Sequence, residues 1–224
     1  MVTDVIQHPS PNFGPRRDGL RPSFIVVHYT AMDNAAAALD RLCDTQAEVS
    51  AHYLISAKGE VTQMVAEDMR AWHAGQGEWA GLKDINSRSI GIELDNRGTH
   101  PFSEPQMSAL ETLLREIMDR WDISPAGVIG HSDMAPGRKT DPGPKFDWAR
   151  LARQGLASLG QTAKGAPEAR PDSYMAAARQ AGFTADADFD TLLQATRLRF
   201  APWRTGPLCA ADLNLCHVLC SKWK

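Results

Sequence analysis

The sequence has no long hydrophobic segment. Its most apolar stretch, residues 24–27, is far shorter than the roughly 18 consecutive apolar residues that a membrane-spanning helix needs. With 43% hydrophobic and 23% charged residues, the 224-residue chain has the balance of a folded globular protein. These features exclude a fibrous or disordered chain, and we expect no association with a membrane.

An excess of positive charge is also lacking. The chain has 24 Lys and Arg against 27 Asp and Glu, which gives a formal net charge of -3. Non-specific binding of nucleic acid depends on positive charge that neutralises phosphates. We therefore expect no nucleic-acid partner.

Cysteine is scarce. Cys43 stands alone, and Cys209, Cys216 and Cys220 are spaced by seven and four residues. On a helix this spacing places all three on one face, where they cannot easily pair with one another. A metal site there lacks a fourth ligand, because His217 is turned about a quarter-turn away. We interpret these residues as buried, reduced thiols, which favours a reducing compartment.

The N-terminus does not have the basic start and apolar core of a secretory signal. Together with the cysteines, this predicts a cytoplasmic location. The alternative is a leader that was removed and replaced by Met1, which would place the protein in the periplasm or cell envelope.

Strand and helix patterns alternate through the first two thirds of the chain. The strand patterns are buried apolar runs and one β-hairpin, at residues 23–30, 52–65, 89–94 and 128–130. The helical patterns follow capping residues or are rich in Ala, at residues 34–43, 103–121 and 147–156. This alternation predicts an α/β fold, with a mixed central β-sheet flanked by helices, in a domain of residues 1–157.

The composition changes after this domain. Residues 158–172 are rich in Gly, Pro and Ala and are interpreted as a linker. Three helical stretches follow, at residues 173–180, 188–200 and 210–223. They predict a small all-α C-terminal domain of residues 173–224.

Two histidines, His28 and His131, stand where predicted strands end, and Asp141 lies in a loop rich in Pro and Gly. Two imidazoles and one carboxylate make a three-ligand zinc set with a fourth position open, as in catalytic sites. Because the three are far apart in sequence, the pattern alone also allows three unrelated polar residues.

Five segments are recognisable in order along the chain. They are Phe-Ile-Val-Val-His-Tyr-Thr (24–30), Ser-Ala-His-Tyr-Leu-Ile (50–55), Arg-Ala-Trp-His-Ala-Gly (70–75), Asn86 with Ser-Ile-Gly-Ile-Glu (89–93), and Gly-His-Ser-Asp-Met-Ala-Pro-Gly-Arg-Lys-Thr-Asp-Pro-Gly (130–143). Through them the chain resembles the zinc-dependent N-acetylmuramoyl-L-alanine amidases. That family includes AmpD-type recycling enzymes, phage amidase lysozymes and peptidoglycan recognition proteins.

The resemblance implies one Zn²⁺ per chain, held by His28, His131 and Asp141. It implies that Glu93 takes a proton from the attacking water and passes one to the leaving amine. It also implies that Lys139 stabilises the oxyanion of the tetrahedral intermediate. Relatives that only bind the polymer lack some of the zinc ligands, so the enzyme is favoured over the alternative, a non-catalytic peptidoglycan-binding or sensing protein.

Other polar residues in these segments are candidates for substrate binding. His73 is expected near the substrate. Asn86, Arg70 and Arg88 are candidates for contacts with sugar or with stem-peptide carboxylates, which Arg binds bidentately. His52 is expected to be a packed, hydrogen-bonded residue instead.

The function implied by the resemblance is hydrolysis of the amide bond between N-acetylmuramic or anhydro-N-acetylmuramic acid and the L-alanine of a peptidoglycan stem peptide. A cytoplasmic enzyme would act on soluble anhydro-muropeptides, and an exported one on intact murein. The C-terminal domain is similar to helical peptidoglycan-binding domains, with a structural appendage as the alternative. We expect no organic cofactor and no obligatory protein partner.

Overall fold

The computed structural model describes residues 4–159 and 169–213. Its strands are β1 (Ile6–Gln7), β2 (Phe13–Pro15), β3 (Phe24–Tyr29), β4 (Tyr53–Ile55), β5 (Val61–Gln63), β6 (Met69–Ala71), β7 (Ser89–Leu94) and β8 (Val128–Gly130). Its α-helices are α1 (Ala35–Cys43), α2 (Ile85–Arg88), α3 (Glu104–Trp121), α4 (His131–Met134), α5 (Trp148–Arg153), α6 (Pro171–Gln180) and α7 (Phe189–Phe200). Short 3₁₀ turns cover Arg17–Gly19, Pro125–Gly127 and Ala210–Leu213.

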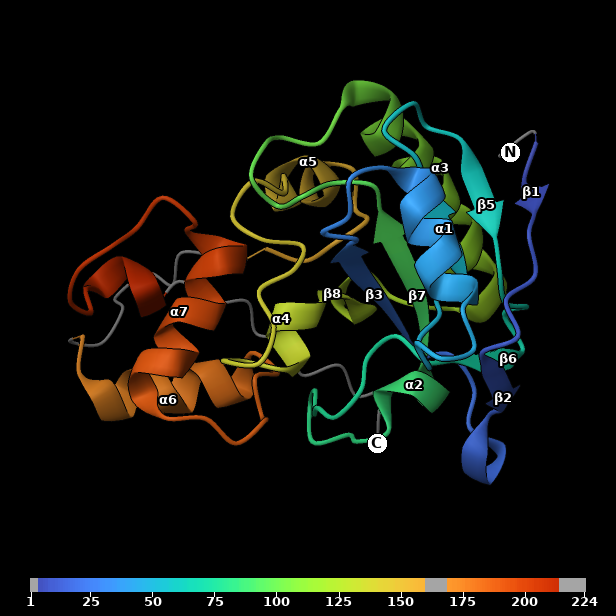
Figure 1. Cartoon of the computed structure of the whole chain (residues 1–224). Helices are drawn as coiled ribbons and strands as arrows, with labels where there is room; N and C mark the ends of the chain where they lie inside the picture. The colour runs from blue at the N-terminus through green and yellow to red at the C-terminus, as the bar shows by residue number, and fades with distance from the viewer. Residues whose placement is uncertain (1–3, 160–168, 214–224) are drawn as a thin grey trace.

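The central sheet has six strands in the order β1-β5-β4-β7-β3-β8. All neighbours are parallel except β4 and β5, which form the predicted hairpin. Helices pack against this sheet, as Figure 1 shows. The predicted α/β fold with a mixed sheet is thereby confirmed. The second sheet, formed by β2 and β6, was not predicted, because these three-residue strands are too short to show a period.

Strand β3 is buried on both faces, and its side chains alternate between two cores. Ile25 and Val27 belong to a cluster with side chains of α3 and α5. Phe24 and Val26 belong to a second cluster that contains side chains of α6 and α7. The continuous apolar run of this strand therefore reflects burial by helices on each side.

The C-terminal helices bury their apolar side chains against the sheet domain. Phe183 and Leu192 share the cluster of Phe24 and Val26, and the ring of Trp79 stacks edge-on with Phe183 at 5.0 Å. Figure 1 shows α6 and α7 beside α4 at one side of the sheet. The division into two domains stays a prediction.

Most predicted boundaries agree with the structure. Ser103 caps α3 by accepting from the Gln106 amide, and Asp147 caps α5. Helix α5 ends three residues before the predicted Leu156, because Gly155 adopts φ +70 and Leu156 N–H bonds back to Leu151. This left-handed C-terminal motif closes the helix.

Two C-terminal elements differ from the predicted boundaries. Helix α6 begins at Pro171, inside the predicted linker, because proline fits the first helical position. Of the expected helix at 210–223, residues 210–213 form a 3₁₀ turn. The remaining residues, with Cys216, His217 and Cys220, lie outside the described residues. Cys43 and Cys209 are free thiols, but both are half-buried and not buried as predicted.

None of the described helices combines the length and hydropathy needed to cross a bilayer.

A buried carboxylate, Glu67, joins the hairpin to the end of α3. It accepts hydrogen bonds from Tyr53 at 2.8 Å, from Arg120 at 2.7 and 2.9 Å, and from the indole of Trp121. Burial by itself raises the pKa of Glu67, but these hydrogen bonds outweigh it, so the pKa lies below its ordinary value.

Glu67→Gln is expected to lower the free energy of unfolding by about 2 kcal/mol near pH 7, because the amide cannot accept all of these bonds. The contribution of the carboxylate is present above the ordinary Glu pKa of about 4.3 and is lost as the pH falls through the lower pKa of the folded protein. Denaturant unfolding should therefore show the difference from wild type shrinking as the pH is lowered. The exposed Glu60→Gln is the control; a difference for Glu67→Gln that persists in acid would contradict this assignment.

Candidate active site

Parallel pairing brings three functional positions to one edge of the sheet. His28 near the end of β3 lies in register with Glu93 of β7, and Val27 lies in register with Gly130 of β8. His131 follows Gly130 directly and begins α4. The carboxyl ends of these neighbouring strands therefore present two imidazoles and a carboxylate to the same place.

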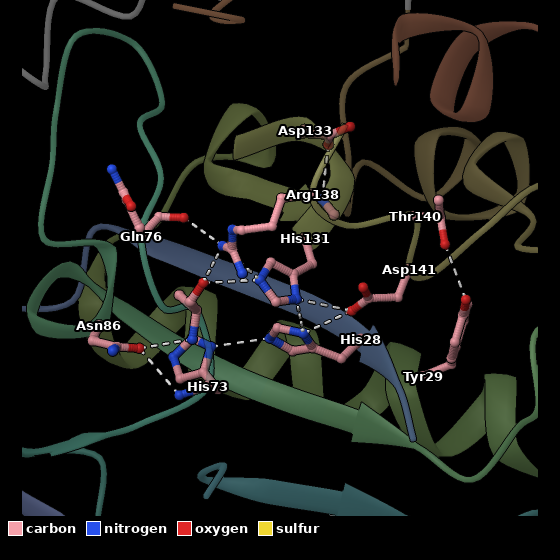
Figure 2. Close-up of polar contacts among 12 residues, drawn as sticks. His28, Tyr29, His73, Gln76, Asn86, His131, Asp133, Arg138, Thr140 and Asp141 are labelled. Carbon is pink, nitrogen blue, oxygen red and sulfur yellow. Dashed lines mark hydrogen bonds and ion pairs between the residues drawn. The ribbon is translucent and has the colours of Figure 1, made fainter. Parts of the chain in front are cut away.

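His28, His131 and Asp141 converge on one point (Figure 2). The Nδ1 atoms of the two histidines are 2.9 Å apart, and they lie 2.9 and 3.1 Å from Asp141 Oδ2. All three residues are buried. They form the group that could hold a metal ion in the described part of the chain. The structure thus brings together the three residues expected as ligands.

A chain of hydrogen bonds determines the tautomer of His28. Ser89 Oγ donates to the Ile85 carbonyl at 2.6 Å, so its oxygen is left to accept from His73 Nε2 at 3.1 Å. His73 Nδ1 is then an acceptor, and it takes the Nε2 proton of His28 at 3.0 Å. His28 Nδ1 consequently carries no proton.

A hydrogen bond to a backbone carbonyl also determines the tautomer of His131. Its Nε2 donates to the Ala74 carbonyl at 2.9 Å, which leaves Nδ1 unprotonated. Arg138 donates to the same carbonyl at 2.7 Å and also to the Gln76 carbonyl. The Arg138 side chain, seen beside His131 in Figure 2, therefore fixes the carbonyl that orients this ring. Sequence reasoning did not single out Arg138, although it stands inside the fifth recognised segment.

The donor set fits a divalent metal. Two imidazole lone pairs and a carboxylate oxygen face one another with no proton between them, an arrangement that repels itself unless a cation is present. Burial, followed by the effect of His131, lowers the pKa of His28 to about 4, so the ring stays neutral at pH 7. A neutral imidazole is the form that binds a metal.

Glu93 lies beside this group without a partner for one of its oxygens. Its Oε2 is buried and has no hydrogen bond among the described residues. Burial, and next the charge of Asp141, raise the pKa of Glu93 to about 8, while Lys139 opposes the rise. Such a carboxyl group is suited to exchanging a proton near neutral pH.

These residues line a pocket of about 460 Å³. Lys139 is exposed and lies on its wall, as do Trp72, Arg41 and Thr140, which sequence reasoning did not select. Trp72 and Thr140 lie inside recognised segments, whereas Arg41 is an exposed residue of α1 outside all five segments and had no sequence signal.

The substrate-binding candidates lie in different places. His73 lines the pocket and contacts His28. Asn86 is buried and accepts from the backbone amides of His73 and Ala74 (Figure 2). Asn86 therefore supports the loop that carries His73, and contact between its side chain and substrate stays a prediction.

The two arginines and His52 do not line this pocket. Arg70 bonds to Ser87 and pairs with Asp84, and Arg88 donates to the Lys83 carbonyl. A role for either in substrate binding stays a prediction.

His52 is fully buried, where it accepts from Gly91 N–H and bonds to the Met69 carbonyl. This is the packed, hydrogen-bonded role expected for it.

Comparison with known proteins agrees with this site. The family model N-acetylmuramoyl-L-alanine amidase matches residues 18–144, which include both histidines and Asp141. The amidase AmiD of Escherichia coli is 42% identical over 62% of this chain, but the match covers only 55% of AmiD. The 1,6-anhydro-N-acetylmuramyl-L-alanine amidase AmpD of E. coli is 38% identical over 64% of this chain and 87% of AmpD.

A solved structure of E. coli AmiD, in complex with the substrate anhydro-N-acetylmuramic acid-L-Ala-D-gamma-Glu-L-Lys, superposes with a TM-score of 0.78 and 31% identity. The superposition covers 92% of each chain, a share that residues 4–159 alone cannot supply. The similarity therefore extends into the C-terminal helices. The resemblance found in the five segments is confirmed: this chain belongs to the N-acetylmuramoyl-L-alanine amidase family of hydrolases.

Proposed function

We propose that this chain is a zinc-dependent amidase that hydrolyses the bond between the lactyl group of anhydro-N-acetylmuramic acid and the L-alanine of a stem peptide. The observation that carries the proposal is the convergence of His28, His131 and Asp141 next to the unpartnered oxygen of Glu93. A module that only binds the polymer has no need for unprotonated ligands and a proton-accepting carboxylate at one point.

His28 Nδ1, His131 Nδ1 and Asp141 Oδ2 would hold the zinc ion. When bound, zinc supplies Lewis-acid polarisation of the scissile carbonyl and lowers the pKa of water toward roughly 7. His73 and the Ala74 carbonyl keep the two rings oriented through their Nε2 atoms.

Glu93 and Lys139 would carry the remaining steps. Glu93 Oε2 accepts a proton from the attacking water and donates one to the departing alanine amine. Lys139 lines the pocket, where its ammonium would offset the negative charge that forms on the carbonyl oxygen. The same positive charge favours the carboxylate form of Glu93.

The substrate we propose is a soluble anhydro-muropeptide. The name of AmpD and the substrate bound to AmiD both specify the anhydro sugar. A cytoplasmic enzyme could reach such a product of murein turnover, so the proposed role is recycling. A periplasmic enzyme would also meet intact murein.

Mass spectrometry of products tests this choice. The zinc-loaded protein is incubated in parallel with anhydro-muramyl tripeptide and with intact sacculi, and a chelator-treated sample is the control. We expect release of the tripeptide from the soluble substrate alone. Comparable release from sacculi would make the chain a wall-acting amidase. If neither substrate is cut by zinc-loaded protein, the catalytic proposal is wrong and the binding alternative replaces it.

Glu93→Gln should reduce kcat by about 10²–10⁴-fold, because the amide can neither accept nor donate the transferred proton. Its zinc content, measured by elemental analysis, should stay at the wild-type value, since Glu93 is not among the ligands. The exposed Glu48→Gln, outside the pocket, is the matched control. Wild-type kcat in Glu93→Gln would remove Glu93 from the mechanism.

Gly91→Ala tests the orientation of His28 by His73. A Cβ at Gly91 would lie 2.4 Å from the His73 ring, so the ring must move and its bond to His28 must be disturbed. We expect zinc affinity, measured by competition with a chelator, to fall about tenfold or more. Gly14→Ala is the control, because a Cβ there meets nothing within 4 Å. Unchanged affinity in a folded Gly91→Ala would refute the role given to His73.

A further inference from the structure

One ion pair joins the C-terminal helices to the segment that carries His131. Arg199, on α7, is 4% exposed and donates to Asp133 Oδ2 at 2.6 Å. Asp133 is fully buried and lies on α4, two residues after His131. The pair therefore connects residues that are 66 positions apart in the sequence.

The guanidinium of Arg199 is fixed on several sides. It donates to the carbonyls of Val128 at 3.1 Å and Ser158 at 2.9 Å. Its central carbon lies 4.1 Å above the ring of Trp148. Val128 is the first residue of β8 and Trp148 begins α5, so this one side chain touches three elements around the site.

Asp133 connects Arg199 to the backbone next to the proposed metal ligands. Its Oδ2 also accepts from the backbone amide of Gly130, the residue just before His131. Ser132, which lies between His131 and Asp133 on α4, donates its amide to the Asp141 carbonyl at 2.9 Å. The backbones of both ligands, His131 and Asp141, are thereby attached to the turn that Asp133 stabilises.

A second contact of α7 lies on the same loop. Gly137, between His131 and Lys139, is packed against Thr191 so closely that a Cβ at Gly137 would be 2.8 Å from the Thr191 methyl group. Helix α7 therefore supports the loop of His131 and Asp141 at two points, one polar and one steric.

We propose that Arg199 is a positioning residue: through Asp133 it holds the His131 turn in the geometry that retains the metal, so the C-terminal helices complete the active site. The inference rests on the metal site proposed above. Arg199 itself does not line the pocket, and its hydrogen bonds go to Asp133, Val128 and Ser158.

If Arg199 served only to stabilise the fold, its variants would behave differently. A buried Asp133 without a cation would destabilise the protein, and any comparable loss of a buried ion pair would do the same. Arg197, on the same helix, offers the nearest comparison: it pairs at 2.7 Å with the buried Asp212, which also has Arg204 at 3.8 Å. Only a positioning role makes metal retention depend on Arg199 and not on Arg197.

The test compares the full-length wild type with Arg199→Met, Arg199→Lys and Arg197→Met, all loaded with zinc. Transfer of zinc to a colorimetric chelator is timed at a temperature at which circular dichroism shows each variant folded. We expect Arg199→Met to lose zinc about tenfold or more faster than wild type. Arg199→Lys should fall between the two, since it keeps the charge and loses donors to the carbonyls. Arg197→Met should lose zinc at the wild-type rate despite a lowered Tm.

Equal rates of zinc loss in wild type and Arg199→Met would overturn the inference, as would equal acceleration in Arg199→Met and Arg197→Met. If Arg199→Met does not fold, Arg199→Lys decides, and a wild-type rate in that variant would overturn it. If the wild type holds no zinc, the proposed metal site itself is wrong, which separates the two failures.

Discussion

The parallel pairing of β3 with β7 and β8 is the constraint on which the rest depends. It places His28, Glu93 and His131 at the same edge of the sheet although they are far apart in the sequence. Parallel strands need covered faces, because their connections cross the sheet and both sides become buried. The site and the two hydrophobic cores thus follow from one topology.

Several groups around the proposed metal site orient its histidines without being proposed ligands themselves. Each histidine uses Nε2 for an orienting hydrogen bond and keeps Nδ1 free, so the two rings are fixed in tautomer and direction. The flat approach of the His73 ring requires glycine at position 91. The geometry of the proposed metal site therefore depends on residues such as His73, Ala74 and Gly91 as much as on the proposed ligands.

The sequence predicted those strands, turns and helix caps that are determined by neighbouring residues. The apolar run of β3, the hairpin and the Ser103 and Asp147 caps could be recognised because neighbouring residues decide them. The grouping of His28, His131 and Asp141 required the family resemblance, since their spacing is not a motif. Two hydrogen bonds could not be predicted from the sequence: Arg138 to the Ala74 carbonyl, and Arg199 to Asp133. Each joins segments more than 60 residues apart.

The C-terminal helices are packed into the hydrophobic core of the sheet domain. A helical domain attached by a linker would favour a polymeric substrate, because tethering to murein would be its evident purpose. Here α6 and α7 cover Phe24 and Val26 of the central strand, and α7 contacts the loop of Asp141. Since these helices bury side chains of the central strand in this chain, their presence does not by itself favour intact murein over a soluble muropeptide.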